Sequence, residues 1–179
     1  MFHYQWTEKI IQSRWIIPIN LLLFVIGTDQ GSKYFASNTL DSPTEIFLFN
    51  NIIQFSLIEN YGGFLGVVND LPQALRFFLL NIVVSFLLLG CLFYIFVYKN
   101  RPRRFRFSLL LVTGGGISNL LDRLFNKGGV TDFLSIGVGN LRTGIFNLAD
   151  VYILVGSFVL GYLFFSSPEK NNHIPSNRH

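Results

Sequence analysis

Four apolar segments limit the folds that this chain can adopt, because each is close to the ~20 residues that an α-helix needs to cross a bilayer. They lie at about residues 11–29, 75–98, 107–125 and 146–165. Only 13% of the residues are charged, whereas an average soluble domain has about 25%. The sequence therefore predicts an all-α membrane protein with four transmembrane helices, and it excludes a disordered chain.

Two of these segments contain residues that weaken the hydropathy signal. The first contains Pro18 and Asn20, and the third contains Gly114-Gly115-Gly116. Membrane helices tolerate glycine and proline because neighbouring helices cover the freed backbone. The three glycines predict close helix packing rather than a phosphate-binding loop, since they lack a preceding strand and a Lys-Ser/Thr ending. Ser157 and Gly161 have the spacing of another packing site.

The basic residues predict the orientation in the membrane. Most lie near the two termini or in the short segment 99–106 between two apolar segments. By the positive-inside rule, both termini and this segment face the cytoplasm, which also explains the net charge of +4 without a nucleic-acid partner. No small-residue cleavage site follows the first helix, so we expect it to stay uncleaved.

The segment at about 40–70 is rich in Ile and Phe with patches of alternation, and it meets a turn at Asn60-Tyr61-Gly62-Gly63. This pattern predicts strands, and hence a small extracytoplasmic β-sheet region between helices 1 and 2. We expect residues 1–165 to form a single membrane domain. Residues 166–179 are predicted to form a polar cytoplasmic tail.

Four aspartates from separate segments are predicted to converge near the outer membrane boundary. Asp122 lies on one stripe of the third helix with Gly115 and Asn119, and the other three are Asp29, Asp132 and Asp150. A carboxylate at membrane depth costs several kcal/mol unless it is paired, so it marks a functional site by default.

Each of these residues also has a purely structural interpretation. Asp122 and Arg123 are candidates for an ion pair, and Asp29 is also interpretable as a polar residue at the end of the first helix, near Lys33. Asn147 is suited to capping the fourth helix, with Asp150 as a favourable acid in its first turn. All three histidines lie near the termini, so we expect no metal and no cofactor among the carboxylates.

The chain resembles the lipoprotein signal peptidases, also called signal peptidase II, a family of four-helix aspartyl proteases of the bacterial inner membrane. The resemblance spans about residues 15–165, and its motifs occur in the family's order. They are Asp29-Gln30-x-x-Lys33, Asn60-x-Gly62, Gly114-Gly115-x-x-Ser118-Asn119-x-x-Asp122-Arg123, Val130-x-Asp132-Phe133 and Phe146-Asn147-x-Ala149-Asp150.

This resemblance implies a catalytic pair, Asp132 and Asp150. The residues that it implies as supporting or substrate-binding are Asp29, Lys33, Asn60, Gly62, Asn119, Asp122, Arg123 and Asn147. Two departures from the family pattern affect the shape of the pocket: Ser118 replaces the usual glycine, and the segment from Asn60 to Phe64 is one residue short.

The implied activity is the removal of signal peptides from diacylglyceryl-modified prolipoproteins, by a cut just before the lipidated cysteine. The implied site faces the outer leaflet, the expected partners are the lipid-modified substrates and membrane lipid, and we expect a monomer. Two other hypotheses start from the same aspartates: a small proton or ion carrier, and a structural subunit whose polar residues only hold helices together.

Overall fold

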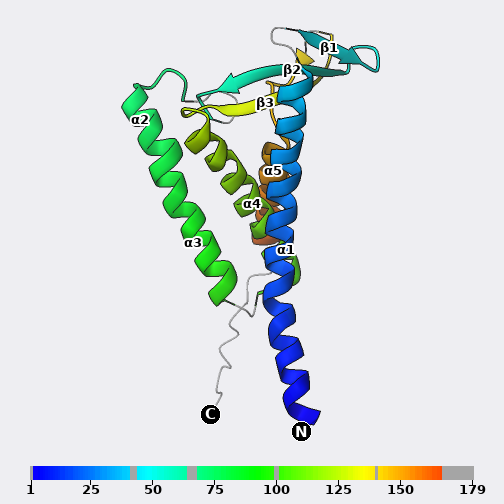
Figure 1. Cartoon of the computed structure of the whole chain (residues 1–179), viewed down its shortest axis with the longest axis vertical. Helices are drawn as coiled ribbons and strands as arrows, with labels where there is room; N and C mark the ends of the chain where they lie inside the picture. The colour runs from blue at the N-terminus through cyan, green and yellow to red at the C-terminus, as the bar shows by residue number, and fades with distance from the viewer. Residues whose placement is uncertain (1, 41–43, 64–67, 99–100, 140, 167–179) are drawn as a thin grey trace, which may run out of the picture.

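The computed structural model describes residues 2–40, 44–63, 68–98, 101–139 and 141–166, with side chains from residue 15 onward. Long helices form an elongated bundle with a small sheet at the end opposite the N-terminus (Figure 1). The helical elements are α1 (Phe2–Thr39), α2 (Gln73–Phe77), the π-helical turn η2 (Phe78–Val83), α3 (Val84–Val97), α4 (Arg103–Phe125) and α5 (Leu148–Phe165). The predicted tail lies almost wholly outside the described residues.

Two helices in the described part of the chain are long and apolar enough to cross a membrane. They are Gln73–Val97, which runs through α2, η2 and α3, and Leu148–Phe165. Their most apolar windows are only 17% and 11% buried inside the protein, so most of their apolar surface faces outward, as lipid contact requires. The helices α1 and α4 carry more polar and charged residues, and four transmembrane helices remain a prediction.

The helix α4 lies at the centre of the bundle and packs against α1, α3 and α5. Its three glycines allow this packing. A methyl group on Gly115 would lie 2.6 Å from the Ala149 carbonyl oxygen of α5, and one on Gly116 would lie 2.6 Å from Leu88 of α3. The predicted helix packing at these glycines is therefore confirmed.

The second predicted packing site, at Ser157 and Gly161, is wrong. Ser157 is exposed, and no atom of the described residues lies within 4 Å of a methyl group placed on Gly161. The close contact of α5 is instead made by Gly156, where an added methyl group would lie 2.6 Å from the Ser108 carbonyl oxygen. Helical spacing of small residues does not reveal which face of a uniformly apolar helix meets a neighbour.

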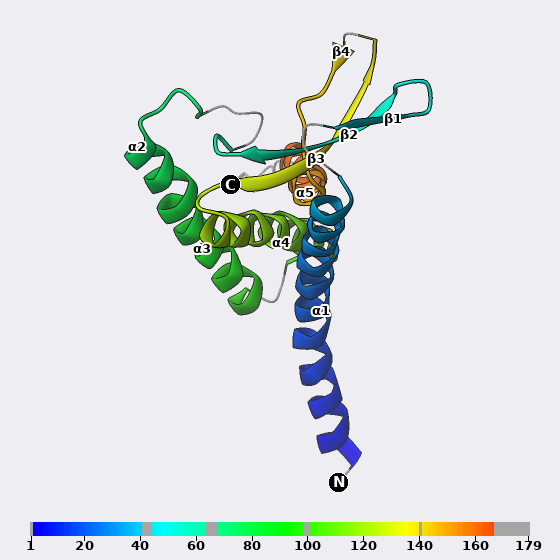
Figure 2. The ribbon, with the colours of Figure 1, turned by 45° about the horizontal axis from the view of Figure 1, so that its top comes forward.

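The sheet has four antiparallel strands in the order β1 (Glu45–Leu48), β2 (Ile53–Asn60), β3 (Val130–Val138) and β4 (Leu141–Arg142). Only β1 and β2 come from the segment between the first two long helices. The prediction of a sheet confined to that segment is therefore incomplete, because half of its strands lie between α4 and α5. Figure 2 shows the two hairpins side by side beyond the end of the bundle.

The pairing of β2 with β3 brings distant residues together: Asn60 lies opposite Val130, and Ile58 lies opposite Asp132. Two apolar clusters flank the region beneath the strands. Leu22, Ile95 and Leu110 form one inside the bundle. Ala36, Leu40 and Phe133 form the other, between α1 and the sheet. Buried polar residues occupy the space between these clusters.

Candidate active site

Asp132 lies in β3 and is only 1% exposed. Its two carboxylate oxygens accept hydrogen bonds from two asparagines: Asn147 Nδ2 donates to Oδ1 at 2.7 Å, and Asn60 Nδ2 donates to Oδ2 at 2.9 Å. The backbone N–H of Gly62 donates to Asn60 Oδ1 at 3.0 Å, which holds the Asn60 amide in place. The next residue in this turn, Gly63, has a φ of +72°, a backbone conformation that favours glycine.

Asp150 lies in the first turn of α5, three residues after the capping residue Asn147. The backbone N–H of Asp150 donates to Asn147 Oδ1 at 3.0 Å, and the backbone N–H of Asn147 donates to Asp150 Oδ2 at 3.3 Å. This reciprocal arrangement is a capping box. The predicted cap is confirmed, and Asn147 also contacts both candidate catalytic carboxylates at once.

Asn119 of α4 connects the two sides of the site. Its Nδ2 donates to Asp150 Oδ1 at 2.9 Å, while its Oδ1 accepts from Asn147 Nδ2 at 3.0 Å and from Lys33 Nζ at 2.9 Å. These bonds orient the amide, because only its oxygen can accept from Lys33. Asn119 therefore presents a donor to Asp150.

Lys33 lies between two buried carboxylates. Its Nζ is 2.6 Å from Asp29 Oδ2 and 3.0 Å from Asp122 Oδ2, and the three side chains are 4%, 0% and 4% exposed. The interpretation of Asp29 as a residue at the helix end is wrong, because α1 continues to Thr39 and Asp29 is paired with Lys33 inside it. The alternative of an Asp122–Arg123 ion pair is wrong, because within the described chain the salt bridge of Asp122 is to Lys33.

The remaining bonds of these two carboxylates connect four elements: α1, α4, α5 and β3. Asp29 accepts from Ser118 Oγ and from the backbone N–H of Ala149, both at 2.7 Å. Asp122 accepts from Gln30 Nε2 at 2.7 Å and from the backbone N–H of Thr131 at 3.0 Å. Asp29 therefore ties α1 to the start of α5, and Asp122 ties α4 to the start of β3.

Sequence reasoning did not place Gln30 and Ser118 in the site. Both were visible in the motifs, Gln30 beside Asp29 and Ser118 four residues before Asp122. Ser118, noted only as a departure from the family pattern, donates a hydrogen bond that a glycine cannot supply. Its position one helical turn from Asp122 was the available signal.

A cavity of about 190 Å³ opens beside the candidate carboxylates. Asp132 and Asp150 both line it, together with Asn60, Asn119 and Arg123. Its apolar wall is formed by Leu80, Val84, Val130 and Ile153. The cavity is large enough for a water molecule and part of a peptide chain.

Arg123 brings a positive charge to this cavity. It interacts electrostatically with Asp150, Asp122 and Asp132, and its Nη1 lies 3.5 Å from the Asn119 carbonyl oxygen. Its Nε is buried and has no hydrogen-bond partner in the described structure. The guanidinium therefore has an unused donor beside the carboxylates.

Burial raises the pKa of the Asp132 carboxyl to about 6. The hydrogen bonds from Asn60 and Asn147 favour the charged form and oppose this rise, and the charge of Asp150 adds to it. Two neighbouring carboxyl groups do not ionise independently, so the pair holds a proton to higher pH than an isolated aspartate would. This arrangement supplies an acid and a base in one cavity.

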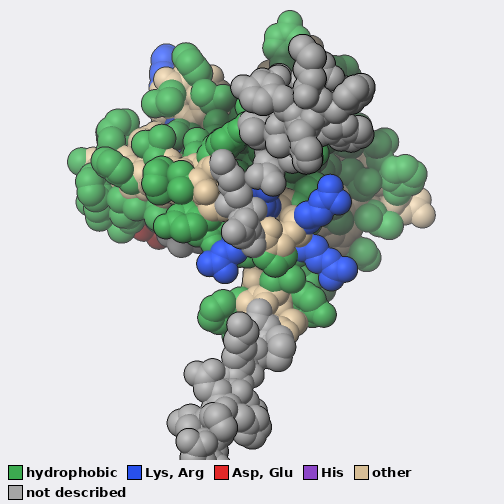
Figure 3. Space-filling view, turned by 90° about the horizontal axis from the view of Figure 1, so that it is seen from below, with side chains coloured by type: hydrophobic (Ala, Val, Ile, Leu, Met, Phe, Trp, Pro, Cys, Tyr) green, Lys and Arg blue, Asp and Glu red, His purple; other side chains and the backbone are tan. Residues whose placement is uncertain are grey.

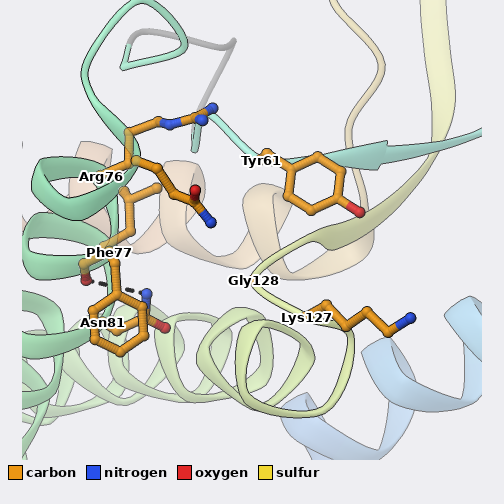
Figure 4. A pocket seen from close by; sticks show the side chains of 8 residues that line it. Tyr61, Arg76, Phe77, Asn81, Lys127 and Gly128 are labelled. Atoms are coloured by element: carbon orange, nitrogen blue, oxygen red, sulfur yellow. Dashed lines mark hydrogen bonds between the residues drawn. The ribbon is translucent and has the colours of Figure 1, made fainter.

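A second hollow, of about 140 Å³, adjoins the first through Leu80, which lines both. Figure 4 shows the Arg76 guanidinium extending toward Tyr61, while the Lys127 side chain points away from the hollow. Asn81 is turned back onto its own helix, where its Nδ2 donates to the Phe77 carbonyl oxygen at 3.1 Å. None of the predicted site residues lines this hollow.

In the described residues, no group of three or more His, Cys, Asp or Glu side chains is arranged to hold a metal ion. The donors around the carboxylates are side-chain amides, the Ser118 hydroxyl, Lys33 and backbone N–H groups. The chemistry that the site supports on its own is therefore acid–base chemistry at the carboxylates.

Comparisons with known proteins agree on one family. A family model described as signal peptidase (SPase) II matches residues 21–166. A lipoprotein signal peptidase of Borrelia duttonii is 31% identical over 167 residues, covering 88% of this chain and 93% of the relative. One of Clostridium novyi is 30% identical over 145 residues, covering 80% of this chain and 94% of the relative. A solved bacterial membrane enzyme shares the fold at 20% identity, with a TM-score of 0.73, over 89% of this chain and 95% of the other.

Proposed function

The chain belongs to the signal peptidase II family, and we propose that it cuts its substrates with Asp132 and Asp150 as an aspartic catalytic pair. It is a bacterial membrane enzyme that removes signal peptides from prolipoproteins. The proposed bond lies just before the cysteine that carries the diacylglyceryl group. The observation that carries the proposal is that these two aspartates, from different elements, line one cavity.

In the proposed reaction the pair shares one proton. The ionised carboxylate takes a proton from a water molecule as that water attacks the scissile carbonyl carbon, and the protonated carboxyl donates its proton to the carbonyl oxygen. The resulting tetrahedral intermediate collapses when the carboxyl that took the proton from water donates it to the leaving nitrogen and the carbon–nitrogen bond breaks. The other carboxylate takes back the proton from the former carbonyl oxygen, which restores the pair with one shared proton. The shared proton belongs to the pair rather than to either aspartate, because the two groups titrate together.

The neighbouring residues have separate supporting roles in this proposal. Asn147 and Asn60 hold the Asp132 carboxylate, and Asn119 holds that of Asp150. Arg123, with its unused donor, stabilises negative charge as it develops on the substrate oxygen. Lys33, Asp29 and Asp122 do not line the cavity. Their role is to lock α1 and α4 against the elements that carry the catalytic pair.

The proposed placement in the membrane has four spanning helices, with both termini in the cytoplasm and the site near the outer leaflet of the inner membrane. Apolar side chains on the outer face of α1 support a span there: Ile17, Leu23 and Phe24 are each at least 60% exposed. The sheet then lies outside the membrane.

Asn60 lines both the catalytic cavity and an outer crevice of about 500 Å³, which provides a route for the polar part of the substrate. The enzyme acts as a monomer in this proposal.

The comparisons do not support the alternative of a proton or ion carrier. The buried carboxylates of the described chain, Asp29, Asp122 and Asp132, gather at one end of the bundle. A carrier needs polar groups through the depth of the membrane. The inner half of the bundle instead contains the apolar cluster of Leu22, Ile95 and Leu110.

The test is single-turnover cleavage of a diacylglyceryl-modified prolipoprotein and of its unlipidated form, with the products identified by mass. Wild type should cut only the lipidated form, just before the cysteine. Asp132→Asn and Asp150→Asn should each lose at least about 10³-fold in rate, since neither variant can complete the proton transfers. Asp70→Asn is the matched control, because Asp70 is exposed and outside the site.

Folded Asp132→Asn or Asp150→Asn protein that cut at the wild-type rate would refute the catalytic pair. Cleavage of both substrate forms at equal rates would refute the requirement for lipid while leaving the peptidase activity intact. Thermal unfolding of each variant separates loss of chemistry from loss of fold.

A further inference from the structure

A groove of about 330 Å³ opens between α1 and α4, at the end of the bundle opposite the sheet. It is lined by Ile17, Pro18, Leu21, Arg103, Arg106, Phe107 and Leu110. Figure 3 views the molecule from this end and shows Lys and Arg side chains gathered there beside hydrophobic ones. Asp122 lies sixteen residues along α4 from Arg106, about 24 Å at 1.5 Å per residue, so the groove is separate from the catalytic cavity.

The residues of α4 that line the groove change from charged to apolar along the helix. Arg103, Arg106, Phe107 and Leu110 are spaced i, i+3, i+4 and i+7, which places them on one face. The charged pair lies at the start of α4, and the apolar pair lies deeper in the bundle. On the facing helix, Ile17 and Leu21 continue the apolar wall, one turn apart. The length from Arg103 to Leu110 is about 10 Å.

The positive charge in the groove is not neutralised by the described part of the protein. Neither Arg103 nor Arg106 forms a salt bridge with a described residue, and none of the described acidic side chains lines the groove. The Arg106 Nε is buried and has no hydrogen-bond partner there. A buried guanidinium donor without an acceptor costs free energy, and an anionic ligand oxygen would supply that acceptor.

We propose that this groove binds an anionic phospholipid, with its phosphate at Arg103 and Arg106 and one acyl chain along Ile17, Leu21, Phe107 and Leu110. The charged residues lie at the start of the groove and the apolar residues lie deeper. This order matches an amphiphile whose head group stays at the membrane surface while its acyl chain extends into the membrane. A free anion would use the arginines but not the apolar wall. The basic end of a signal peptide would be repelled by the same arginines. The proposal depends on the membrane placement above but not on the catalytic pair.

The test measures binding of dioleoyl phosphatidylglycerol to the purified full chain in an uncharged detergent, with dioleoyl phosphatidylcholine as the reference lipid. Salt on the order of 0.5 M screens diffuse attraction, because the Debye length then falls to a few ångströms. We expect Arg106→Gln and Arg103→Gln each to weaken binding of the anionic lipid about fivefold. Inorganic phosphate and glycerol 3-phosphate, which lack acyl chains, should not compete.

Arg104→Gln is the matched control. It removes the same charge from the same turn of α4, yet Arg104 does not line the groove. Binding should change by less than about twofold, below the ~fivefold effect of one arginine contact. An equal loss in Arg104→Gln and Arg106→Gln would overturn the proposal in favour of diffuse surface attraction. Competition by inorganic phosphate, or equal binding of the two lipids, would also overturn it. Arg103 is exposed, so Arg103→Gln gives a result even if Arg106→Gln fails to fold.

Discussion

The triad of Asp29, Lys33 and Asp122 gives the sharpest prediction about stability. Lys33→Met keeps the length of the side chain but removes a charge that lies 2.6 Å and 3.0 Å from two carboxylates. The substitution leaves both carboxylates without their cation. They also stay out of contact with water, because no more than 4% of any of the three side chains is exposed. Breaking a buried pair by removing one partner costs about 3–5 kcal/mol.

This cost should lower the midpoint of thermal unfolding by about 10 °C, since 1 kcal/mol corresponds to about 2–4 °C in a chain of this size. Helical circular dichroism of the purified protein in detergent follows the transition. Lys127→Met is the matched control: Lys127 is exposed and in no described salt bridge, so its midpoint should shift by less than about 2 °C.

A second substitution tests the mechanism of the loss. Lys33→Met changes the net charge of the triad from −1 to −2, and adding Asp122→Asn returns it to −1. The double variant should therefore be more stable than Lys33→Met alone, although Asp122→Asn by itself is destabilising. The reasoning is refuted if Lys33→Met unfolds at the same temperature as wild type. It is also refuted if the double variant loses the sum of the free energies lost by the two single variants.

Three further predictions follow from the site. The raised pKa of Asp132 means that the folded chain holds a proton more tightly than the unfolded one. The stabilisation that Asp132 contributes is therefore complete below about pH 4 and is lost as pH rises through about 6, a change of about 3 kcal/mol in the free energy of unfolding. The difference in this free energy between wild type and Asp132→Asn, followed across this pH range, should reveal the change. Gly115→Ala should destabilise by about 1–3 kcal/mol and slow cleavage, because its methyl group meets the Ala149 carbonyl oxygen. Gly90→Ala is the comparison: Gly90 has open space around it, so this change should stabilise the protein by about 1 kcal/mol. Equal melting points for Gly115→Ala and Gly90→Ala would count against the close packing of Gly115. Asn147→Ala should cost about 1–2 kcal/mol through the lost cap and also reduce the cleavage rate, whereas an effect on melting alone would show that Asn147 is only a cap.

The sequence by itself determined the features that depend on neighbouring residues. Apolar length predicts the helices, because a helix satisfies its own backbone hydrogen bonds within one segment. The cap at Asn147 was predictable because its partner is three residues away. The glycines of α4 predicted close packing from their small size, although the same reasoning placed the contact of α5 at the wrong residues.

Only the tertiary structure decided how distant polar groups pair. Asp122 lies next to Arg123 in the chain, yet its salt bridge is to Lys33 from α1. The β2–β3 pairing brings Asn60 to Asp132 across 72 residues, and neither strand alone specifies its partner. A carboxylate accepts from any donor that reaches it, so its choice depends on how helices and strands pack, and that packing is set by the whole chain.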